Sequence, residues 1–89
     1  MHSSLFVVRA LFTGSRARFA AVVPQKVAKT AVSRTKIRRK IYEAVGLIYV
    51  EVKQPVHVII MAKTPVLTAP FSDIVDDLKK IFVKVGIMK

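Results

Sequence analysis

The stretch Arg34-Thr35-Lys36-Ile37-Arg38-Arg39-Lys40-Ile41-Tyr42-Glu43 combines a dense run of cations with two isoleucines four positions apart. From about residue 31 to residue 47 the apolar residues recur with the period of a helix, and one side of that helix carries Ile37, Ile41, Ala44, Val45 and Ile48. Thr30 or Ser33 offers an oxygen that caps its start. The stretch therefore predicts a helix that is anchored to a core on one side and presents cations on the other.

The cations of this stretch favour binding to phosphate groups. Three of them lie opposite the isoleucines, while Arg34 and Arg38 follow one another along the flank of the helix. Guanidinium groups bind phosphate through two parallel hydrogen bonds, and the first amides of a helix also suit phosphate oxygens. A solvated helix face is the alternative interpretation, but such faces usually mix signs, and only Glu43 offsets these cations. We therefore expect phosphate contacts along this helix.

Two short apolar runs before the helix predict strands. Leu5–Phe12 and Arg18–Val23 are rich in Val, Phe and Leu, and the Thr-Gly-Ser sequence at 13–15 suits a turn between them. Pro24 ends the second run because it has no N–H for a sheet ladder. We expect the two runs to pair as an antiparallel hairpin.

The second half of the chain predicts one more strand and a closing helix. Val56–Ala62 is nearly all apolar, as in strands that are buried on both faces, and Lys63–Pro70 predicts a loop. Leu47–Val52 continues the first helix or forms a short extended piece, and the pattern leaves both open. A strong helical period then places on one side Phe71, Ile74, Val75, Leu78, Ile81, Phe82 and Val85.

The elements follow one another in the order β-β-α-β-α and predict a single domain over residues 1–89. The expected fold class is α/β (α+β), a two-layer sandwich in which the helices pack on one face of a small sheet. No cysteine is present, which excludes disulfides and a Cys/His zinc site. This composition fits a reducing compartment, and we expect a cytoplasmic protein.

The balance of charge points to a polyanionic partner. The chain carries 16 Lys and Arg against 5 Asp and Glu, a formal net charge of +11, and no acidic residue precedes Glu43. RNA, DNA and an anionic membrane surface all qualify as partners. The apolar runs fall far short of the ~20 residues needed to span a bilayer. The first two dozen residues also resemble a mitochondrial presequence, since they contain Arg and Ser and no acid; the alternative is that they form the two strands.

Residues 31–43, Ala-Val-Ser-Arg-Thr-Lys-Ile-Arg-Arg-Lys-Ile-Tyr-Glu, are similar to the signature Arg-Asn-Arg-x-Lys-Arg-x-x-Arg-Glu of a known family. Residues 25–29, Gln-Lys-Val-Ala-Lys, look like the Lys-Lys-Val-Gly-Lys connection that precedes that signature. On these motifs the chain resembles the protein subunit of bacterial ribonuclease P over about residues 4 to 84. The further segments that resemble the strands and the closing helix of the family are Leu5–Val8, Arg18–Val23, Val58–Lys63 and Phe71–Phe82.

Several positions depart from the family pattern. Thr35 stands where the family usually has Asn, Lys36 where the second Arg of its triplet lies, and Tyr42 where another Arg is common. Thr30 looks like a one-residue insertion. The family usually begins with a helix that walls one side of a cleft, whereas this sequence reaches its first strand almost at once. It is therefore similar to a short form that lacks most of that helix.

The resemblance implies the ribonuclease P protein fold, which is like domain 2 of ribosomal protein S5, and a role in tRNA processing. In this family the catalyst is an RNA with bound Mg²⁺, which releases the 5′ leader of precursor tRNA, and the protein is a subunit of that holoenzyme. The residues implied to contact the catalytic RNA are Arg34, Thr35, Lys36, Arg38, Arg39, Lys40, Lys26 and Lys29. The residues implied to contact the leader, in a cleft over the sheet, are Arg9, Arg18, Phe19 and Phe6. The expected partners are the catalytic RNA and precursor tRNA, with no membrane and no obligate protein partner.

Some of these residues have an alternative interpretation. A strand phenylalanine is more often a core residue than a platform for bases, whereas Arg9 has little reason to face the helices. We expect Asp73, Asp76 and Asp77 to form a solvated face rather than a metal site, and His57 to be a core or sheet-edge residue. No catalytic residue and no metal-binding motif is expected in the chain. A ribosomal or other structured-RNA-binding protein without a processing role is the alternative function, and a DNA-binding module is a third.

Overall fold

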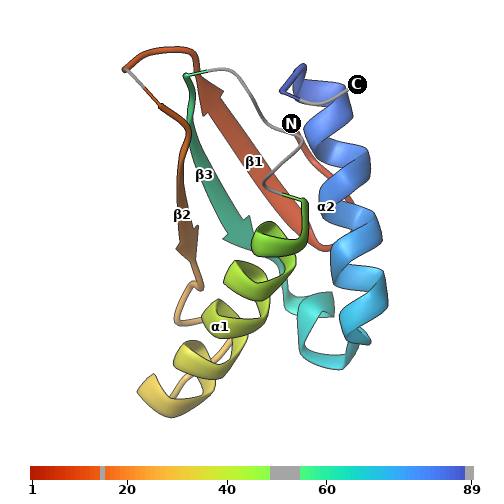
Figure 1. Ribbon diagram of the computed structural model, residues 1–89. Helices are drawn as coiled ribbons and strands as arrows, with labels where there is room; N and C mark the ends of the chain where they lie inside the picture. Colours follow the sequence, from red (N-terminus) through yellow and green to blue (C-terminus); the bar gives the residue numbers. More distant parts are fainter. Residues whose placement is uncertain (15, 49–54, 88–89) are drawn as a thin grey trace.

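The structure is a computed structural model that describes residues 1–14, 16–48 and 55–87. Both helices lie on one side of a three-stranded sheet (Figure 1). The elements are β1 (Phe6–Leu11), β2 (Arg18–Val22), α1 (Ala31–Ile48), β3 (His57–Ala62), the 3-10 helix η2 (Thr64–Thr68) and α2 (Phe71–Val85). The two-layer α+β sandwich and the β-β-α-β-α order are confirmed. The segment Lys63–Pro70, which the sequence predicts as a loop, contains η2.

The third strand lies between the first two, so the predicted hairpin is wrong. β1 pairs with β3 antiparallel, and β2 pairs with β3 parallel. The first residue of β3, His57, lies opposite both Leu11 and Arg18, so the connection over residues 12–17 crosses the end of β3. Because neighbouring strands are about 4.8 Å apart, this connection spans only about 10 Å. Gly14 turns the chain there with a φ of +88°, whereas Ser15 lies outside the described residues.

The two faces of β3 differ, so the prediction that this strand is buried on both faces is also wrong. Its alternate side chains lie buried under the helices (Val58, Ile60 and Ala62) or exposed on the other face (His57, Ile59 and Met61). The side chain of Ile59 is 46% exposed and that of Met61 is 41% exposed. Exposed and buried positions alternate along the strand because both helices cover the same face of the sheet (Figure 1). The composition does not reveal this alternation, since isoleucine occurs on both faces of the strand. His57, predicted as a core or sheet-edge residue, is an exposed residue of the central strand.

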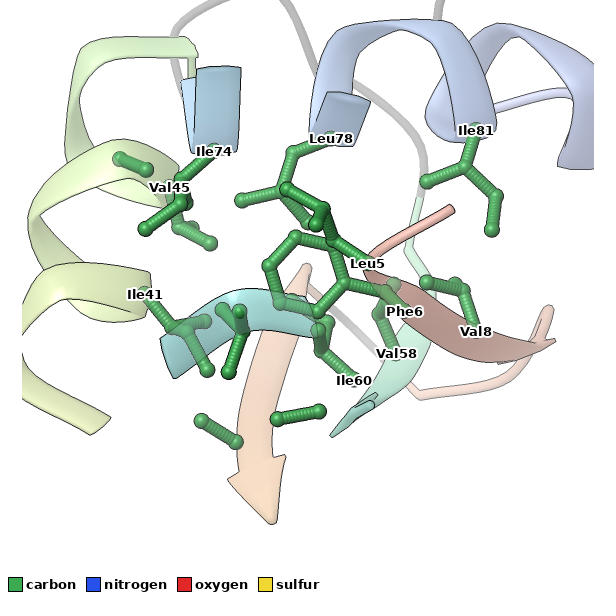
Figure 2. Close-up of a cluster of buried hydrophobic side chains, with 14 of the residues drawn as sticks. Leu5, Phe6, Val8, Ile41, Val45, Val58, Ile60, Ile74, Leu78 and Ile81 are labelled. Carbon is green, nitrogen blue, oxygen red and sulfur yellow. The ribbon is translucent and has the colours of Figure 1, made fainter. Parts of the chain in front are cut away.

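Side chains from both helices meet those of the sheet in one apolar core (Figure 2). The side chains that meet there come from α1 (Ile41, Val45), α2 (Ile74, Leu78, Ile81), β1 (Phe6, Val8) and β3 (Val58, Ile60). The predicted apolar side of α1 is buried in full: Ile37, Ile41, Ala44, Val45 and Ile48. On α2 the buried members of the predicted stripe are Ile74, Leu78, Ile81 and Phe82. The helical periods of the sequence therefore correctly identify the residues that the two helices contribute to the core.

The start of α1 resolves one alternative that the sequence leaves open. Thr30 caps the helix, because its Oγ1 accepts a hydrogen bond of 3.1 Å from the N–H of Ser33. At the other end Leu47 and Ile48 are helical. The rest of the ambiguous segment, residues 49–52, lies outside the described residues.

The first residues of the chain pair along the outer edge of β1. The N–H of Val8 donates to the carbonyl of Met1 (2.8 Å), and the ammonium group of Met1 donates to the carbonyl of Val8 (3.1 Å). On α2, the carboxylate of Asp77 accepts hydrogen bonds from Ser3 Oγ and from the N–H of Leu5. Asp77 is half-buried and holds this segment against the helix, so the prediction of a solvated face is wrong for this residue.

Truncation of adjacent isoleucines on β3 tests the one-sided burial. Ile60→Ala removes a fully buried side chain and is expected to lower the free energy of unfolding by about 2–5 kcal/mol, through lost burial and a residual cavity. Ile59→Ala makes the same change on the exposed face, and a loss below about 1 kcal/mol is expected. Urea denaturation followed by circular dichroism measures both values. Equal losses would contradict the burial pattern of β3.

Candidate nucleic-acid interface

The cations of α1 project from the core as the sequence predicts. Ile37 and Ile41 are buried, and the four cations around them are exposed: Lys36, Arg38, Arg39 and Lys40. Arg38 donates from Nη2 to Thr35 Oγ1 at 3.4 Å, which places two of the predicted contact residues side by side on the helix. Burial of the apolar side holds the helix in place, so the exposed cations are presented on a rigid support. We call these four side chains the cationic face of α1.

Arg34, predicted to contact RNA, also makes hydrogen bonds within the protein that the sequence did not indicate. Its Nη1 donates hydrogen bonds to the carbonyls of Ala28 (3.1 Å) and Lys29 (3.2 Å), and its side chain is half-buried. Thr35, the next residue, donates from Oγ1 to the carbonyl of Ala31 at 2.9 Å. Arg34 therefore ties the connection before α1 to the first turns of the helix.

The connection before α1 also carries the other two predicted cations, Lys26 and Lys29. Val27 and Ala28 are buried, and the N–H groups of both donate to the carbonyl of Pro24, at 2.9 Å and 3.2 Å. Lys26 and Lys29, which flank the buried pair, are exposed. The connection is thus anchored by its apolar residues. Lys29 lies two residues before the first residue of α1, whereas Lys26 lines a hollow together with Val7 and Met61.

The face of the sheet away from the helices forms a second cationic surface. The register sets three rows across the strands β1, β3 and β2: Leu11, His57, Arg18; Arg9, Ile59, Ala20; and Val7, Met61, Val22. We call these nine residues the open face. Both predicted cations, Arg9 and Arg18, lie on it and are exposed. Beyond Val7 and Met61 a hollow of about 350 Å³ opens between the segments 24–27 and 62–65.

Phe6 and Phe19 do not lie on the open face, so their predicted place in a cleft over the sheet is wrong. Phe6 is fully buried in the core. The ring of Phe19 points to the helix layer and stacks on Phe82 of α2, with 5.8 Å between ring centroids and 27° between planes. Strand alternation indicates this outcome, because Phe6 faces opposite to Arg9 and Phe19 opposite to Arg18.

The open face also contains residues that the sequence analysis did not assign to it, His57, Ile59 and Met61. The register of β3 between two strands places them there, and no local sequence signal reveals that register.

Tyr42 makes a contact between the helix layer and the sheet that the sequence analysis also did not predict. The hydroxyl of Tyr42 accepts a hydrogen bond of 3.1 Å from the N–H of Ala21, so it fastens α1 to the outer edge of β2.

The side chains in the described parts of the chain do not converge on a metal site. Among them, no group of three His, Cys, Asp or Glu residues could hold a metal ion. Every buried side-chain nitrogen or oxygen in the described residues has a hydrogen-bond partner. In the same residues, none of the helices has the length and apolarity that crossing a membrane requires.

The fold and its two surfaces define a class: a small α+β protein with one exposed cationic helix and one open, arginine-bearing sheet face. The model of the Ribonuclease P family matches residues 1–86, and the chain belongs to this family. Family members are parts of a tRNA-processing ribonucleoprotein, so RNA is the partner that membership implies.

Solved structures confirm the fold. The RNase P protein of Staphylococcus aureus superposes with a TM-score of 0.85 at 21% sequence identity, covering 100% of this chain and 82% of that one. The RNase P protein from Thermotoga maritima gives a TM-score of 0.84 at 17% identity, covering 94% of this chain and 80% of that one. No curated protein matches the chain in sequence.

Substitution of two arginines on α1 tests whether Arg34 stabilises the fold while Arg38 serves as an exposed cation. Arg34→Ala is expected to lower the free energy of unfolding by about 1–2 kcal/mol, because two carbonyl groups lose their charged donor. Arg38→Ala removes the same group from an exposed position, and a change within about 0.5 kcal/mol is expected. Urea denaturation of both variants provides the comparison. A smaller effect at Arg34 than at Arg38 would contradict the bridging role.

Proposed function

We propose that this protein is the protein subunit of a ribonuclease P holoenzyme. In this proposal it binds the catalytic RNA and the 5′ leader of precursor tRNA, and it assists the endonucleolytic removal of that leader. The observation that carries the proposal is the cationic face of α1, held rigid by a buried apolar side, in a chain of the Ribonuclease P family. Structured RNA presents closely spaced phosphates, which a fixed row of cations matches.

The cationic face of α1 is the proposed contact with the catalytic RNA. Arg38 and Arg39 offer guanidinium groups that bind phosphate through paired hydrogen bonds. Lys29 adds an ammonium group close before the first turn of the helix, whose amides also attract phosphate, and Lys26 adds a second one at the hollow beside Met61. Arg34 and Thr35 complete this surface, and Arg34 also holds its shape through its bonds to the connection before α1.

The open face is the proposed path of the leader. Arg9 and Arg18 are exposed on neighbouring rows and supply charge for the backbone of an unpaired strand. Between and beyond them lie exposed aliphatic side chains and Met61, which offer apolar contact to bases. The hollow next to Met61 continues this surface past the end of β3. A single strand that crosses the face would contact the two arginines toward one end of the face and apolar side chains toward the other end.

Catalysis is assigned to the RNA in this proposal. Hydrolysis of a phosphodiester with Mg²⁺ needs clustered oxygen ligands. The carboxylates of α2 do not supply such a cluster, since Asp77 is engaged by Ser3 and Leu5 and the described residues hold no metal-binding group of three. The Mg²⁺ of the holoenzyme is therefore expected to be bound mainly by RNA. The chain contributes binding and orientation of the substrate.

Reconstitution with a bacterial ribonuclease P RNA tests the proposal. In low Mg²⁺, where RNA folding and substrate binding are weakest, the protein is expected to raise the rate of precursor tRNA cleavage. Arg38→Gln with Arg39→Gln is expected to remove most of this gain. Lys79→Gln with Lys80→Gln, an equal charge change on the exposed side of α2, is the matched control and is expected to retain it.

The absence of any gain in cleavage by the wild-type protein would overturn the proposal. Binding to ribosomal RNA that is indifferent to a 5′ leader would instead support a structured-RNA-binding protein without a processing role.

The salt dependence of RNA binding gives a quantitative check. Each phosphate contact contributes a slope of about −0.7 to −0.9 to log K against log salt concentration, so neutralising Arg38 and Arg39 is expected to lessen the slope by roughly 1.5. Filter binding or fluorescence anisotropy over a range of KCl concentrations measures it. The Lys79→Gln, Lys80→Gln control is expected to keep the wild-type slope. An unchanged slope in the arginine variant would place the RNA on another surface.

A further inference from the structure

The first three residues of the chain extend the sheet beyond the outer edge of β1. We call residues Met1–Ser3 the N-terminal arm. The arm pairs with β1 antiparallel, and the N–H of Val8 donates to the carbonyl of Met1 at 2.8 Å. In this pairing His2 lies directly opposite Val7, and opposite residues project from the same face of a sheet. The exposed side chain of His2 therefore adds a fourth position to the row of the open face that contains Val7.

Two residues from other elements hold the turn between the N-terminal arm and β1. Asp77 of α2 accepts hydrogen bonds from Ser3 Oγ and, at 3.3 Å, from the N–H of Leu5. Lys63, which follows β3, donates from Nζ to the carbonyl of Ser3 (2.6 Å) and from its N–H to the carbonyl of Leu5 (2.8 Å). Asp77 and Lys63 are both half-buried. The arm is therefore held on one side by β1 and on the other by α2 and Lys63.

The contacts of Asp77 set it apart from the other two carboxylates of α2. Asp73 and Asp76 are exposed, whereas Asp77 is half-buried and bonded to the turn. A carboxylate weakens the attraction of a cationic protein for RNA, so removal of an acid that acts through its charge alone strengthens RNA binding. Loss of Asp77 instead releases a segment that reaches the open face. The two roles predict opposite signs for the effect of its removal.

We propose that Asp77 is a positioning residue for the leader site: from the helix layer it keeps the N-terminal arm docked on β1, and the docked arm presents His2 to the RNA. Val7, Met61 and Val22, which share the row with His2, are aliphatic or carry a thioether. The imidazole adds a flat ring on which an unpaired base stacks. The inference rests on the proposed function, because it takes the open face as the path of the leader.

Cleavage kinetics of the reconstituted holoenzyme test the inference. For a precursor tRNA with a long leader, Asp77→Ala is expected to raise KM about five- to tenfold, as for the loss of one base stack, with kcat nearly unchanged. His2→Gln is expected to raise KM by a similar factor. For a precursor whose leader is a single nucleotide, neither variant is expected to change KM. Asp76→Ala, the same charge change at an exposed position of α2, is the matched control and is expected not to raise KM for either precursor.

Three further measurements separate positioning from a general loss of structure. The double variant His2→Gln, Asp77→Ala is expected to show no larger KM than either single variant, because both changes remove the same contact. Amide hydrogen exchange at Val8 is expected to accelerate in Asp77→Ala and to keep the wild-type rate in His2→Gln. Asp77→Asn retains an acceptor oxygen, so it is expected to keep most of the wild-type KM. Ser3→Ala removes the hydroxyl partner of Asp77 and provides a second variant for the same comparison.

A wild-type KM for the long leader in both Asp77→Ala and Ser3→Ala would overturn the inference. Additive effects of His2→Gln and Asp77→Ala, or equal increases in KM for the two precursors, would also overturn it. When these results occur while the wild-type protein still accelerates cleavage, only the role of Asp77 and the arm fails. A wild-type protein that does not accelerate cleavage would overturn the proposed function, and the inference with it.

Discussion

The central position of β3 determines which face of the sheet is covered and which side chains stay exposed. β3 pairs with β1 along one edge and with β2 along the other, and its inward side chains meet both helices in the core (Figure 2). Because α1 joins the parallel neighbours β2 and β3, it has to cross one face of the sheet, and α2 buries its apolar stripe on the same side. The opposite face receives no covering element from the described residues, and it becomes the open face.

This constraint separates the two cationic surfaces. The cationic face of α1 points away from the core on the helix side, while Arg9 and Arg18 lie on the far side of the sheet. A folded RNA along the helix and an unpaired strand across the sheet would therefore not compete for the same side chains. That separation suits the proposed holoenzyme, in which one protein contacts the catalytic RNA and the substrate leader at the same time.

A chain with a formal charge of +11 repels itself, and the structure balances this repulsion with an apolar core and a few polar links. No charged side chain in the described residues is buried. Three polar contacts join segments that burial alone would leave loose: Arg34 holds the connection before α1, Tyr42 joins α1 to the edge of β2, and Asp77 holds the first residues to α2. Arg34 and Tyr42 bond to backbone groups, and Asp77 accepts from one backbone N–H and from the hydroxyl of Ser3. None of these links uses a cation of the cationic face of α1.

The helices, their buried sides, the element order and the cations of α1 can be predicted from the sequence, because a period of 3.6 residues and a run of like charges are local properties. The sequence also placed Arg9 correctly, since strand alternation opposes it to Phe6. Two features became visible in the folded protein alone: β3 lies between β1 and β2, and His57, Ile59 and Met61 are exposed. Strand order and register depend on contacts between residues far apart in the chain, and a strand that is apolar on both faces carries no local sign of which face the helices will cover.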